Sequence, residues 1–492
     1  MARTSPQEMK EKCGVFGVFD HKEASAVTAL GLHALQHRGQ EASGIVSCLY
    51  GVDSFHTHKA LGYVGDIFSS QHVIDRLKGT MAVGHNRYST AGASDMQNIQ
   101  PLYAQLASGG VVVAHNGNLT DAHSLRRSLA KKGATFQTTS DTEIILHLMA
   151  MSGASSVQDK LVESLSQVHG AYALVVMTPS MLIGVRDPFG VRPLSIGTLE
   201  SSWMLASESC AFDILGGDLW RDVEAGEMVI IDKEGVRSYR PFPSVAKRFC
   251  LFEYIYFSRP DSVVEGRSIY AIRKRVGCEM ARENKVTAAD VVVPIPDSGL
   301  ACAIGYAQES GVPFDMGIIR NHYVGRTFIE PMENIRHFGV RLKHNAHSAV
   351  LKDKVVVLID DSLVRGTTSR KIVAMVRRAG AREVHLRIAS PHVRHPCFYG
   401  IDTPSSEELL ASELDDEAIA REVGVDSIAF LSLERLYRAI HEGKETACAA
   451  SSSSPKGKGF CDACFTGHYP IPLVDVGHAK SVLPLMDTPS TP

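Results

Sequence analysis

The sequence lacks the features that mark membrane-spanning and exported proteins. In its 492 residues no uninterrupted apolar stretch reaches the ~18 residues that a membrane-spanning helix needs. The first residues, MARTSPQEMKEK, contain no apolar segment of the kind found in signal peptides. The expectation that follows is a cytoplasmic protein.

A strong net charge and a disulfide framework are also missing. The formal net charge is −3 at pH 7, which gives no electrostatic attraction to nucleic acid or to a membrane surface. Ten cysteines in a chain of this size do not make a disulfide scaffold, so we expect free thiols, a nucleophile or metal ligands. The length exceeds what one hydrophobic core supports, and two domains are therefore expected.

The sequence contains no phosphate-binding loop of the form GxxxxGK[ST], which argues against a nucleoside triphosphatase. A different anion-binding stretch is present, VVVLIDDSLVRGTTSR at residues 355–370. Its apolar start, residues 355–359, predicts a parallel strand covered on both faces. A helix is expected over Lys371–Arg378. The backbone N–H groups and hydroxyls of residues 365–369, beside that helix, suit a phosphate.

Two adjacent carboxylates, Asp360 and Asp361, follow the predicted strand. Because carboxylates repel a phosphate, these side chains suit ribose hydroxyls or a Mg²⁺ ion. An isolated acidic pair is more often a strand end and a helix cap. The whole pattern, however, resembles the type I phosphoribosyltransferases, which use 5-phosphoribosyl 1-diphosphate. The resemblance implies that the acidic pair contacts ribose and metal, and that the 5-phosphate is held by Arg365, Gly366, Thr367 and Thr368.

The rest of the C-terminal half alternates predicted helices and strands, which indicates a doubly wound parallel sheet. Helices are expected at residues 270–283 and 300–309, and strands at residues 291–296 and 383–390. The motif PIPDSG places Asp297 and Ser298 at the same rim as the acidic pair. A hydroxyl after a strand is usually a helix cap, whereas the resemblance makes Ser298 a Mg²⁺ ligand together with Asp360 and Asp361.

The segment RNHYVGRTFIEP, residues 320–331, resembles the flexible catalytic loop of the same enzymes. The resemblance implies that Arg326 stabilises the charge of the departing diphosphate. Related sequences usually carry lysine where Arg320 stands, so a cation is kept while its geometry differs.

In the N-terminal half, Cys13 begins the alternating run CGVFGVFD, which predicts a strand. A lone cysteine is most often a small buried side chain. Removal of the polar leader, residues 1–12, would make Cys13 the first residue. Its α-amine, with a pKa of about 7.7–8.0, would then act as base for its own thiol. We therefore expect the leader to be a propeptide whose removal activates the thiol.

Four polar motifs follow, and each is predicted to form loops at strand ends that line one site. They are HRGQEASG at residues 37–44, GHNRYSTAG at 84–92, AHNGNL at 114–119 and TTSDTE at 138–143. Arg87 suits a substrate carboxylate, and Asp141 suits the α-ammonium group. Asn116 and the N–H group of Gly117 suit an oxyanion. In isolation, HNG is equally typical of a type I′ turn.

Together and in this order, these motifs resemble the class II glutamine amidotransferases, the N-terminal-nucleophile glutaminases. The resemblance implies a four-layer αββα Ntn-hydrolase fold and hydrolysis of glutamine through a thioester on Cys13. It places Arg87 and Asp141 on the glutamine, together with Arg38 and Gly39 near the nucleophile. The resemblance also implies that Asn116 and Gly117 form the oxyanion hole. Two later stretches, residues 186–197 and 206–213, match the same core, although their own composition indicates structural loop and strand.

The cysteines near the C-terminus have metal-site spacing. Cys461 and Cys464 form a CxxC pair, and Cys250 and Cys397 would complete four thiolates. Four thiolates suit zinc or a [4Fe–4S] cluster, and their chemistry alone does not separate the two. Cys448 is a possible competitor, although a spare thiol is the better interpretation. Core positions are expected for Cys48, Cys210, Cys278 and Cys302.

Taken in order, the two halves resemble the iron–sulfur subgroup of the glutamine phosphoribosylpyrophosphate amidotransferase family. The resemblance implies transfer of the glutamine amide nitrogen to phosphoribosyl diphosphate in purine synthesis, with Mg²⁺ and a structural [4Fe–4S] cluster. It also implies a homotetramer inhibited by purine nucleotides, and glutaminase activity that rises when the ribose substrate binds. The expected divisions are a propeptide (1–12), an amidotransferase domain (13–240), a phosphoribosyltransferase domain with the cluster (241–470) and a tail (471–492).

Two alternatives have specific counter-arguments. A fructose 6-phosphate amidotransferase or an asparagine synthetase would share the first half, but DDSLVRGTT fits neither acceptor. A ligand-sensing regulator with a transferase-like pocket would have no use for Cys13, Arg87 and Asp141.

Overall fold

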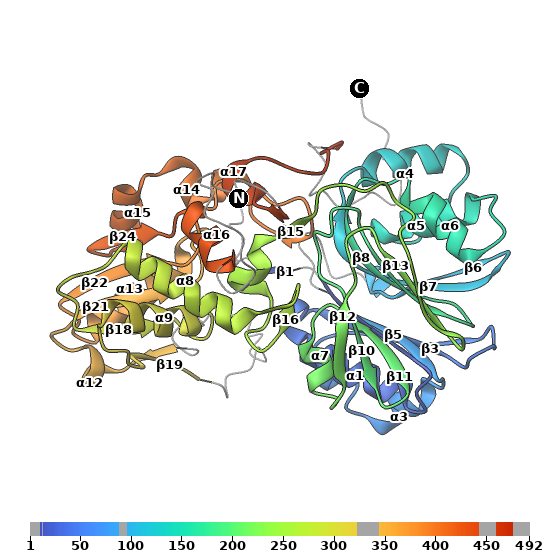
Figure 1. The fold of residues 1–492 in the computed structure, drawn as a ribbon, viewed down its shortest axis with the longest axis horizontal. Coiled ribbons are helices and arrows are strands. Elements are labelled where there is room, and N and C mark those ends of the chain that lie inside the picture. The colour runs from blue at the N-terminus through green and yellow to red at the C-terminus, as the bar shows by residue number, and fades with distance from the viewer. Residues whose placement is uncertain (1–9, 12, 88–95, 322–343, 442–458, 476–492) are drawn as a thin grey trace, which may run out of the picture.

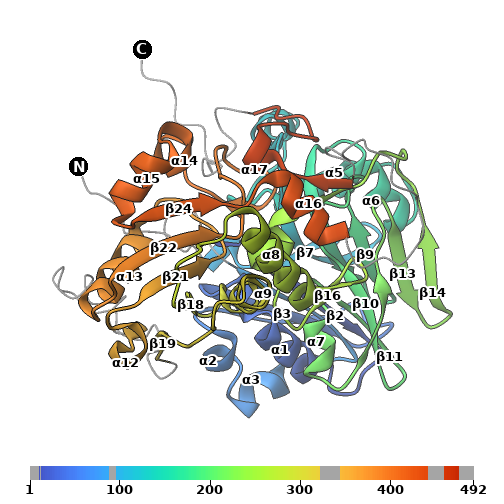
Figure 2. The ribbon, with the colours of Figure 1, turned by 60° about the vertical axis from the view of Figure 1, so that its left-hand side comes forward.

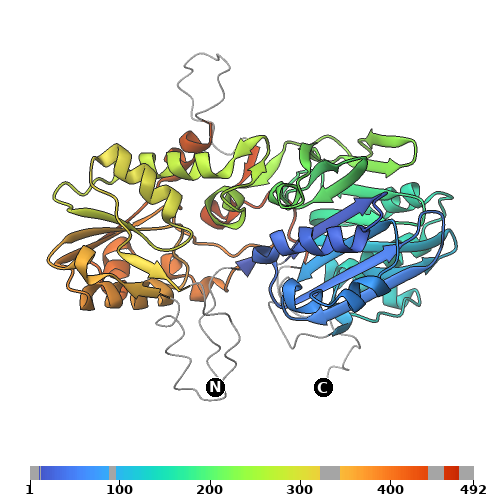
Figure 3. The same cartoon turned by 90° about the horizontal axis from the view of Figure 1, so that it is seen from below.

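The computed structural model describes residues 10–11, 13–87, 96–321, 344–441 and 459–475. Arg326, Cys448 and most of the leader fall outside these ranges. The N-terminal half (residues 13–240) and the C-terminal half (residues 241–475) lie side by side along the longest axis of the molecule (Figure 1). Figure 3 shows the same arrangement from below. None of the helices within the described ranges is long and apolar enough to cross a bilayer.

The N-terminal half contains two antiparallel sheets. The seven-stranded sheet has the order β12 (Asp218–Asp222), β10 (Ser195–Leu199), β11 (Ser202–Ala206), β2 (Cys13–Phe19), β5 (Met81–Arg87), β3 (Ala42–Cys48) and β4 (Phe55–Leu61). The six-stranded sheet has the order β14 (Gly235–Tyr239), β13 (Met228–Asp232), β9 (Leu182–Arg186), β8 (Gly170–Met177), β7 (Gly109–Leu119) and β6 (Leu102–Leu106).

The two sheets pack face to face, and helices cover their outer faces. Val15 and Val83 of the first sheet share a core with Val175 and Leu182 of the second. The outer face of the seven-stranded sheet packs on α1 (Ala24–Ala34). The other outer face packs on α4 (Ala122–Lys131), α5 (Thr142–Met151) and α6 (Val157–Leu165). This arrangement confirms the predicted four-layer αββα fold.

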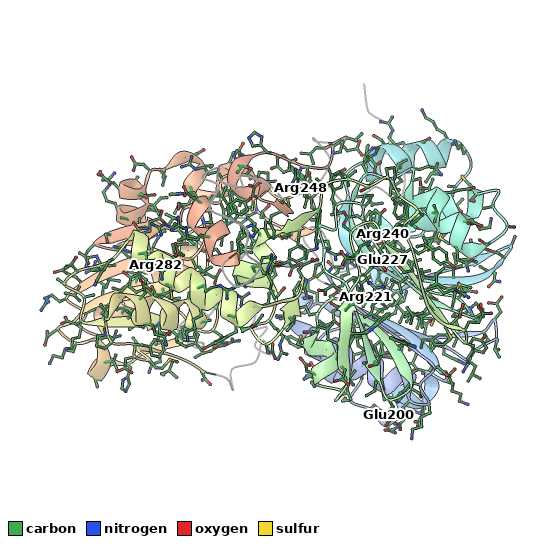
Figure 4. All side chains as sticks on the ribbon, in the orientation of Figure 1. Glu200, Arg221, Glu227, Arg240, Arg248 and Arg282 are labelled. Carbon is green, nitrogen blue, oxygen red and sulfur yellow. The ribbon has the colours of Figure 1, made fainter. Side chains whose placement is uncertain are left out.

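An ion pair also joins the two sheets at one edge. Arg221 Nη2 of β12 lies 2.7 Å from Glu227 Oε1, just before β13, and both residues are labelled in Figure 4. Burial raises the pKa of Glu227, but the hydrogen bonds from Arg221, Ser238 and the Glu224 N–H group together outweigh it, so the pKa lies below its usual value. The carboxylate therefore stays charged where the sheets meet.

The C-terminal half is built on a parallel sheet of β18 (Val291–Pro294), β21 (Val355–Asp360), β22 (Glu383–Ile388) and β24 (Ser427–Phe430). One face packs on α8 (Ile269–Glu283), α9 (Leu300–Ser310) and α16 (Leu433–His441). The other packs on α13 (Thr367–Arg378) and α15 (Asp416–Val423) (Figure 2). Alternate residues of β21 enter the two cores, which confirms a strand covered on both faces. Helix α13 begins four residues earlier than predicted.

A short connecting region joins the halves through shared apolar contacts. Strand β15 (Arg248–Cys250) pairs in parallel with β25 (Gly459–Cys461), and the π-helix η3 (Glu253–Phe257) follows. Ala171 and Val191 of the N-terminal half belong to the same core cluster as these residues. The remaining short elements are β1 (Lys10–Glu11), η1 (Gln36–Arg38), α2 (Val64–Ile67), α3 (Gln71–Arg76), η2 (Met96–Asn98), α7 (Cys210–Asp213), β16 (Val263–Val264), β17 (Arg267–Ser268), β19 (Ile318–Arg320), β20 (His344–Ala346), α12 (Ser348–Leu351), β23 (Ile401–Asp402), η4 (Ser406–Glu408), α14 (Leu410–Glu413) and α17 (Ala463–Thr466).

Helices α8 and α9 meet backbone to backbone at two glycines. A Cβ atom added to Gly277 would lie 1.9 Å from the carbonyl oxygen of Cys302, and one added to Gly305 would lie 1.9 Å from that of Lys274. Gly277→Ala should therefore force the helices apart and destabilise the protein by about 1–3 kcal/mol or more. Thermal unfolding followed by circular dichroism measures this. Gly153→Ala is the control because no atom lies within 4 Å of its added Cβ. Equal melting temperatures for the two variants would contradict the packing.

Candidate active sites

The predicted nucleophile lies beside the predicted substrate arginine. Cys13 begins β2, and its register partner on β5 is Arg87. Directly opposite residues in an antiparallel pair have Cβ atoms about 4.5–5.5 Å apart. The cysteine is buried, with 8% of its surface exposed, whereas Arg87 is partly exposed. The sheet thus brings a thiol and a guanidinium group to one edge.

Gly39, like Arg38, belongs to the motif that is predicted to lie near the nucleophile. A Cβ atom at Gly39 would lie 2.6 Å from the backbone carbon of Asn86. Only glycine lets the turn after η1 approach strand β5 this closely. This close approach fixes the turn against the residue that precedes Arg87.

The prediction of a loop at residues 114–119 is wrong, as is the alternative type I′ turn. These residues belong to β7, where Asn116 pairs with Ala173 and Gly117 with Tyr172 of β8. The sequence misled because a buried strand here carries polar residues. Gly117 has φ +151°, and a Cβ atom there would lie 2.0 Å from the carbonyl oxygen of Ala171. Two of the other polar motifs also begin in regular structure, since residues 84–87 end strand β5 and residues 37–38 belong to η1, whereas residues 138–141 form the predicted loop.

The side-chain amide of Asn116 has unused hydrogen-bonding capacity among the described residues. It is fully buried, and within the described part of the chain neither its Nδ2 nor its Oδ1 atom has a hydrogen-bond partner. A buried amide without partners costs free energy of about 1–3 kcal/mol. A substrate oxygen at Nδ2 would satisfy it, which is what the predicted oxyanion role requires.

Asp141 is held against the same strand. Its Oδ2 atom accepts a hydrogen bond of 2.9 Å from the N–H group of Leu119, and its Oδ1 atom lies 3.7 Å from His115 Nδ1. The structure therefore brings Asp141, Asn116 and Gly117 together through β7. Their assignment to glutamine binding and to the oxyanion hole stays a prediction.

Arg38 lies in a buried network of charges that spans the two halves. Its Nη2 atom is 2.7 Å from Glu253 Oε2 of η3, and its Nε atom donates to Glu208. His37 Nε2 is 2.6 Å from Glu208 Oε1, and Arg192 Nη2 is 2.9 Å from Glu253 Oε1. The side chains of Arg38, Glu208 and Glu253 have no exposed surface. The predicted contact of Arg38 with glutamine stays a prediction, and the structure shows its guanidinium group engaged in these ion pairs.

Burial raises the pKa of both carboxyl groups, but the combined attraction of Arg38 and the other neighbouring cations and hydrogen bonds outweighs it. The pKa values of Glu208 and Glu253 therefore lie well below their usual range. Neither glutamate was among the residues predicted from the sequence. The available signal was a lone glutamate in an otherwise apolar run, as in FCLFEYIYF at residues 249–257.

The predicted residues of the second site also come together. Asp360 ends β21 and Asp361 follows it, and their exposed fractions are 8% and 5%. Burial raises the pKa of Asp361, and hydrogen bonds with Ser298 and Ser362 oppose this rise. Ser298 therefore contacts the acidic pair, as the sequence predicted. A hydrogen bond of 2.9 Å from Asp361 N–H to Asp360 Oδ1 fixes the turn.

The predicted phosphate loop forms the N-terminus of α13. Gly366 has φ +68° at the N-cap position, and Thr367 and Thr368 are the first helical residues. Their N–H groups belong to the first turn, where intrahelical partners are lacking. Arg365 Nη2 lies 2.8 Å from Glu408 Oε2. At the edge of the same site, Arg320 ends β19 and forms an ion pair with Asp297.

The four predicted cysteine ligands lie near one another. Cys250 and Cys461 are register partners in the β15–β25 pair. Burial raises the pKa values of the Cys461 and Cys464 thiols well above the usual value, and proximity to the Cys250 and Cys397 sulfurs raises both further. Among the described residues, however, no three His, Cys, Asp or Glu side chains converge closely enough to hold a single metal ion.

Glu208→Gln should leave the Arg38 charge partly uncompensated in the interior. Breaking a buried ion pair typically costs about 3–5 kcal/mol, so a clear drop in melting temperature is expected. The folded-state pKa of Glu208 is depressed. Its stabilisation is therefore complete above pH ~4.3 and is lost as the pH falls below that value. The variant should show a weaker loss of stability with acid than the parent protein.

Thermal unfolding between pH 3 and pH 7 measures both effects. The control is Glu234→Gln, which removes one partner of an exposed pair with Arg237 and should change stability by less than about 0.5 kcal/mol. Similar melting temperatures for the Glu208 and Glu234 variants would show that the buried network contributes little.

Comparisons with known proteins agree with this geometry. A family described as "Glutamine amidotransferase domain" matches residues 85–213. The amidophosphoribosyltransferase of Rhizobium etli is 51% identical over 95% of this chain and 93% of its own length. That of Bacillus subtilis is 45% identical over 97% of each chain. The B. subtilis glutamine phosphoribosylpyrophosphate (PRPP) amidotransferase, solved in complex with ADP and GMP, superposes with a TM-score of 0.86 at 45% identity, covering 94% of this chain and 98% of that one. Identity at this level over nearly the whole length shows that the chain belongs to the amidophosphoribosyltransferase family.

Proposed function

We propose a two-site mechanism for this member of the family. The chain is a glutamine amidotransferase and a transferase of purine biosynthesis. In the proposal, it joins glutamine, 5-phosphoribosyl 1-diphosphate and water to give 5-phosphoribosylamine, diphosphate and glutamate. The observation that carries the proposal is the pairing of Cys13 with Arg87, together with the buried Asn116 amide, which has no hydrogen-bond partner among the described residues.

The first site hydrolyses glutamine. After the leader (residues 1–12) is removed, the α-amine of Cys13 takes the thiol proton, and the thiolate attacks the side-chain amide carbon. Asn116 Nδ2 and the N–H group of Gly117 donate to the oxyanion that forms. The nitrogen leaves as ammonia with the transferred proton, and water then hydrolyses the thioester to glutamate.

Substrate orientation at the first site depends on two opposite charges. Arg87 binds the α-carboxylate of glutamine, and Asp141 binds its α-ammonium group. Asp141 is suited to this role because the N–H group of Leu119 holds one of its oxygens and leaves the other directed toward β7. Arg38 and Gly39 complete the site from the η1 side in this proposal, with Gly39 setting the approach of the turn to β5.

The second site holds the sugar diphosphate. Asp360 and Asp361 accept hydrogen bonds from ribose hydroxyls, and the turn of Arg365, Gly366, Thr367 and Thr368 binds the 5-phosphate at the N-terminus of α13. Ser298, Asp360 and Asp361 offer the oxygen ligands that Mg²⁺ prefers. A bound Mg²⁺ would neutralise charge on the diphosphate. Arg326, for which we propose a role at the leaving group, lies outside the described residues.

Joining the two sites solves a protonation problem. Free ammonia in neutral water is mostly ammonium, which has no lone pair to attack the ribose carbon. A path that excludes water keeps the nitrogen uncharged between the sites. In the structure, the N-terminal half contacts the C-terminal half through buried apolar residues and the Arg38 network, which supports direct transfer.

For the four cysteines we propose a [4Fe–4S] cluster bound by Cys250, Cys397, Cys461 and Cys464. The thiols are grouped and largely buried, and a bound metal would stabilise their thiolate forms. Four thiolates suit zinc or a [4Fe–4S] cluster, and the family resemblance favours the cluster. A structural role is proposed on the same resemblance.

Further proposals concern regulation and assembly. Since the solved B. subtilis relative was obtained with ADP and GMP, we propose that purine nucleotides act on this chain as feedback inhibitors. A homotetramer in the cytoplasm, the domain boundaries at residues 12, 240 and 470, and the rise in glutaminase activity on binding of the ribose substrate are proposed on the family resemblance.

The two sites should be separable by mutation. Cys13→Ala should abolish glutamine-dependent synthesis and leave synthesis from high ammonia, because only the first site uses the thiol. Asp361→Ala should abolish both activities. Product formation with each nitrogen source measures the difference, and Cys278→Ala, at a partly exposed cysteine of α8, is the control. Glutamine-dependent turnover by the Cys13 variant would refute the nucleophile assignment.

The cluster proposal is tested by metal content. Cys464→Ser should lose bound iron and the visible absorption of an iron–sulfur protein, because one of four ligands is removed. Cys278→Ser should keep both. Metal analysis and absorption spectra of anaerobically purified protein measure this. Stoichiometric zinc in the parent protein, or iron retained by the Cys464 variant, would contradict the proposal.

A further inference from the structure

A loop of the C-terminal half contacts the strand that carries the proposed oxyanion hole. The carbonyl oxygen of Phe398 accepts a hydrogen bond of 3.0 Å from Asn118 Nδ2 of β7. Gly400, two residues later, has φ +109°. A Cβ atom at Gly400 would lie 3.0 Å from Gly117 Cα and 3.2 Å from the Gly117 carbonyl carbon. Two glycine backbones from different halves of the chain therefore touch directly.

This contact packs closely against the backbone of Gly117. On one side lies the carbonyl oxygen of Ala171, 2.0 Å from where a Cβ of Gly117 would be, and on the other lies Gly400. An oxyanion donor must lie about 2.7–3.1 Å from the position of the developing charge. A shift of a few tenths of an ångström at Gly117 is therefore enough to weaken its N–H contact.

The loop that carries Gly400 is itself anchored. The hydroxyl of Tyr399, which is 1% exposed, donates to the carbonyl oxygen of Ile471 at 2.7 Å and accepts from its N–H group at 3.0 Å. The N–H group of Cys397 donates to Thr403 Oγ1 at 2.6 Å. Movement of Gly117 is thus resisted by a fixed backbone.

We propose that Gly400 is a positioning residue for glutamine hydrolysis, through which the C-terminal half holds the oxyanion donor Gly117 in place. The inference rests on the proposed function of Gly117. Only a residue without a side chain fits, because a methyl group at position 400 would press on the Gly117 backbone. The glutaminase is therefore completed by a residue that lies outside its own domain.

The test compares two glycines that both have positive φ. Gly400→Ala adds a methyl group against Gly117. Gly424→Ala, at φ +86° in the same half, adds one with no atom within 4 Å. Gly400→Ala should lower kcat for glutamine about 10- to 100-fold, less than the about 10²–10³-fold loss seen when an oxyanion donor is deleted. Its KM for glutamine and its ammonia-dependent synthesis should stay at the Gly424→Ala values.

Two further measurements separate this inference from the proposed function. Iodoacetamide should alkylate Cys13 in Gly400→Ala at the parent rate, because alkylation needs the thiolate and no oxyanion hole. Rates are expressed per chain that begins at Cys13, counted by mass spectrometry, so that a defect in processing is not mistaken for one in turnover. If the parent protein itself fails to hydrolyse glutamine, the proposed function is wrong rather than the role of Gly400.

A second variant covers the case in which Gly400→Ala does not fold. Asn118→Ala removes the hydrogen bond to the Phe398 carbonyl oxygen without adding bulk, and it should lower the same kcat by a smaller factor with ammonia-dependent synthesis kept. The inference is overturned if Gly400→Ala matches Gly424→Ala in glutamine turnover per processed chain. It is also overturned if Gly400→Ala or Asn118→Ala loses ammonia-dependent synthesis in the same proportion as glutamine-dependent turnover.

Discussion

The buried ion pairs of Arg38 with Glu208 and Glu253 are the constraint on which the joined structure depends. They lie on three segments, η1, the turn after β11 and the π-helix η3, and the last belongs to the C-terminal half. A charge without exposed surface is stable only with its partner in place. The network therefore favours one relative placement of the two halves and disfavours others. Arg273 of α8 extends it, because its guanidinium group donates to the carbonyl oxygens of Tyr254 and Ser258 and lies within electrostatic reach of Asp361.

This placement gives the two sites a common support. The π-helix is held by Arg38 from one half and by Arg273 from the other. The chain then continues through β16 and β17 into α8, which packs on one face of the sheet whose strand β21 ends at the acidic pair. On the opposite side, the loop of Gly400 rests on β7. Each half thus provides an element that fixes the position of the site in the other half. A fusion that only tethered two independent enzymes would not need such contacts.

The sequence was informative where one local pattern decides the structure. The apolar run at residues 355–359 is long enough to indicate a strand covered on both faces, and Asp360 and Asp361 follow it at the sheet edge. It misled at residues 114–119, where polar residues occupy a buried strand and break the usual alternation. Glu208 and Glu253 escaped prediction because their partner, Arg38, lies 170 and 215 residues away. Pairing at such separations leaves no local signal, and neither does the approach of Gly400 to Gly117.

The central claim is that nitrogen released at Cys13 reaches the sugar without leaving the protein. The most direct measurement supplies glutamine labelled with ¹⁵N at the side-chain amide together with a large excess of unlabelled ammonium, and determines the isotope in the 5-phosphoribosylamine formed. If the path is internal, the product keeps the ¹⁵N label at every ammonium concentration at which the ammonia-dependent rate stays small. Dilution of the label in proportion to the external ammonium would show that the nitrogen equilibrates with solvent, and it would contradict the account.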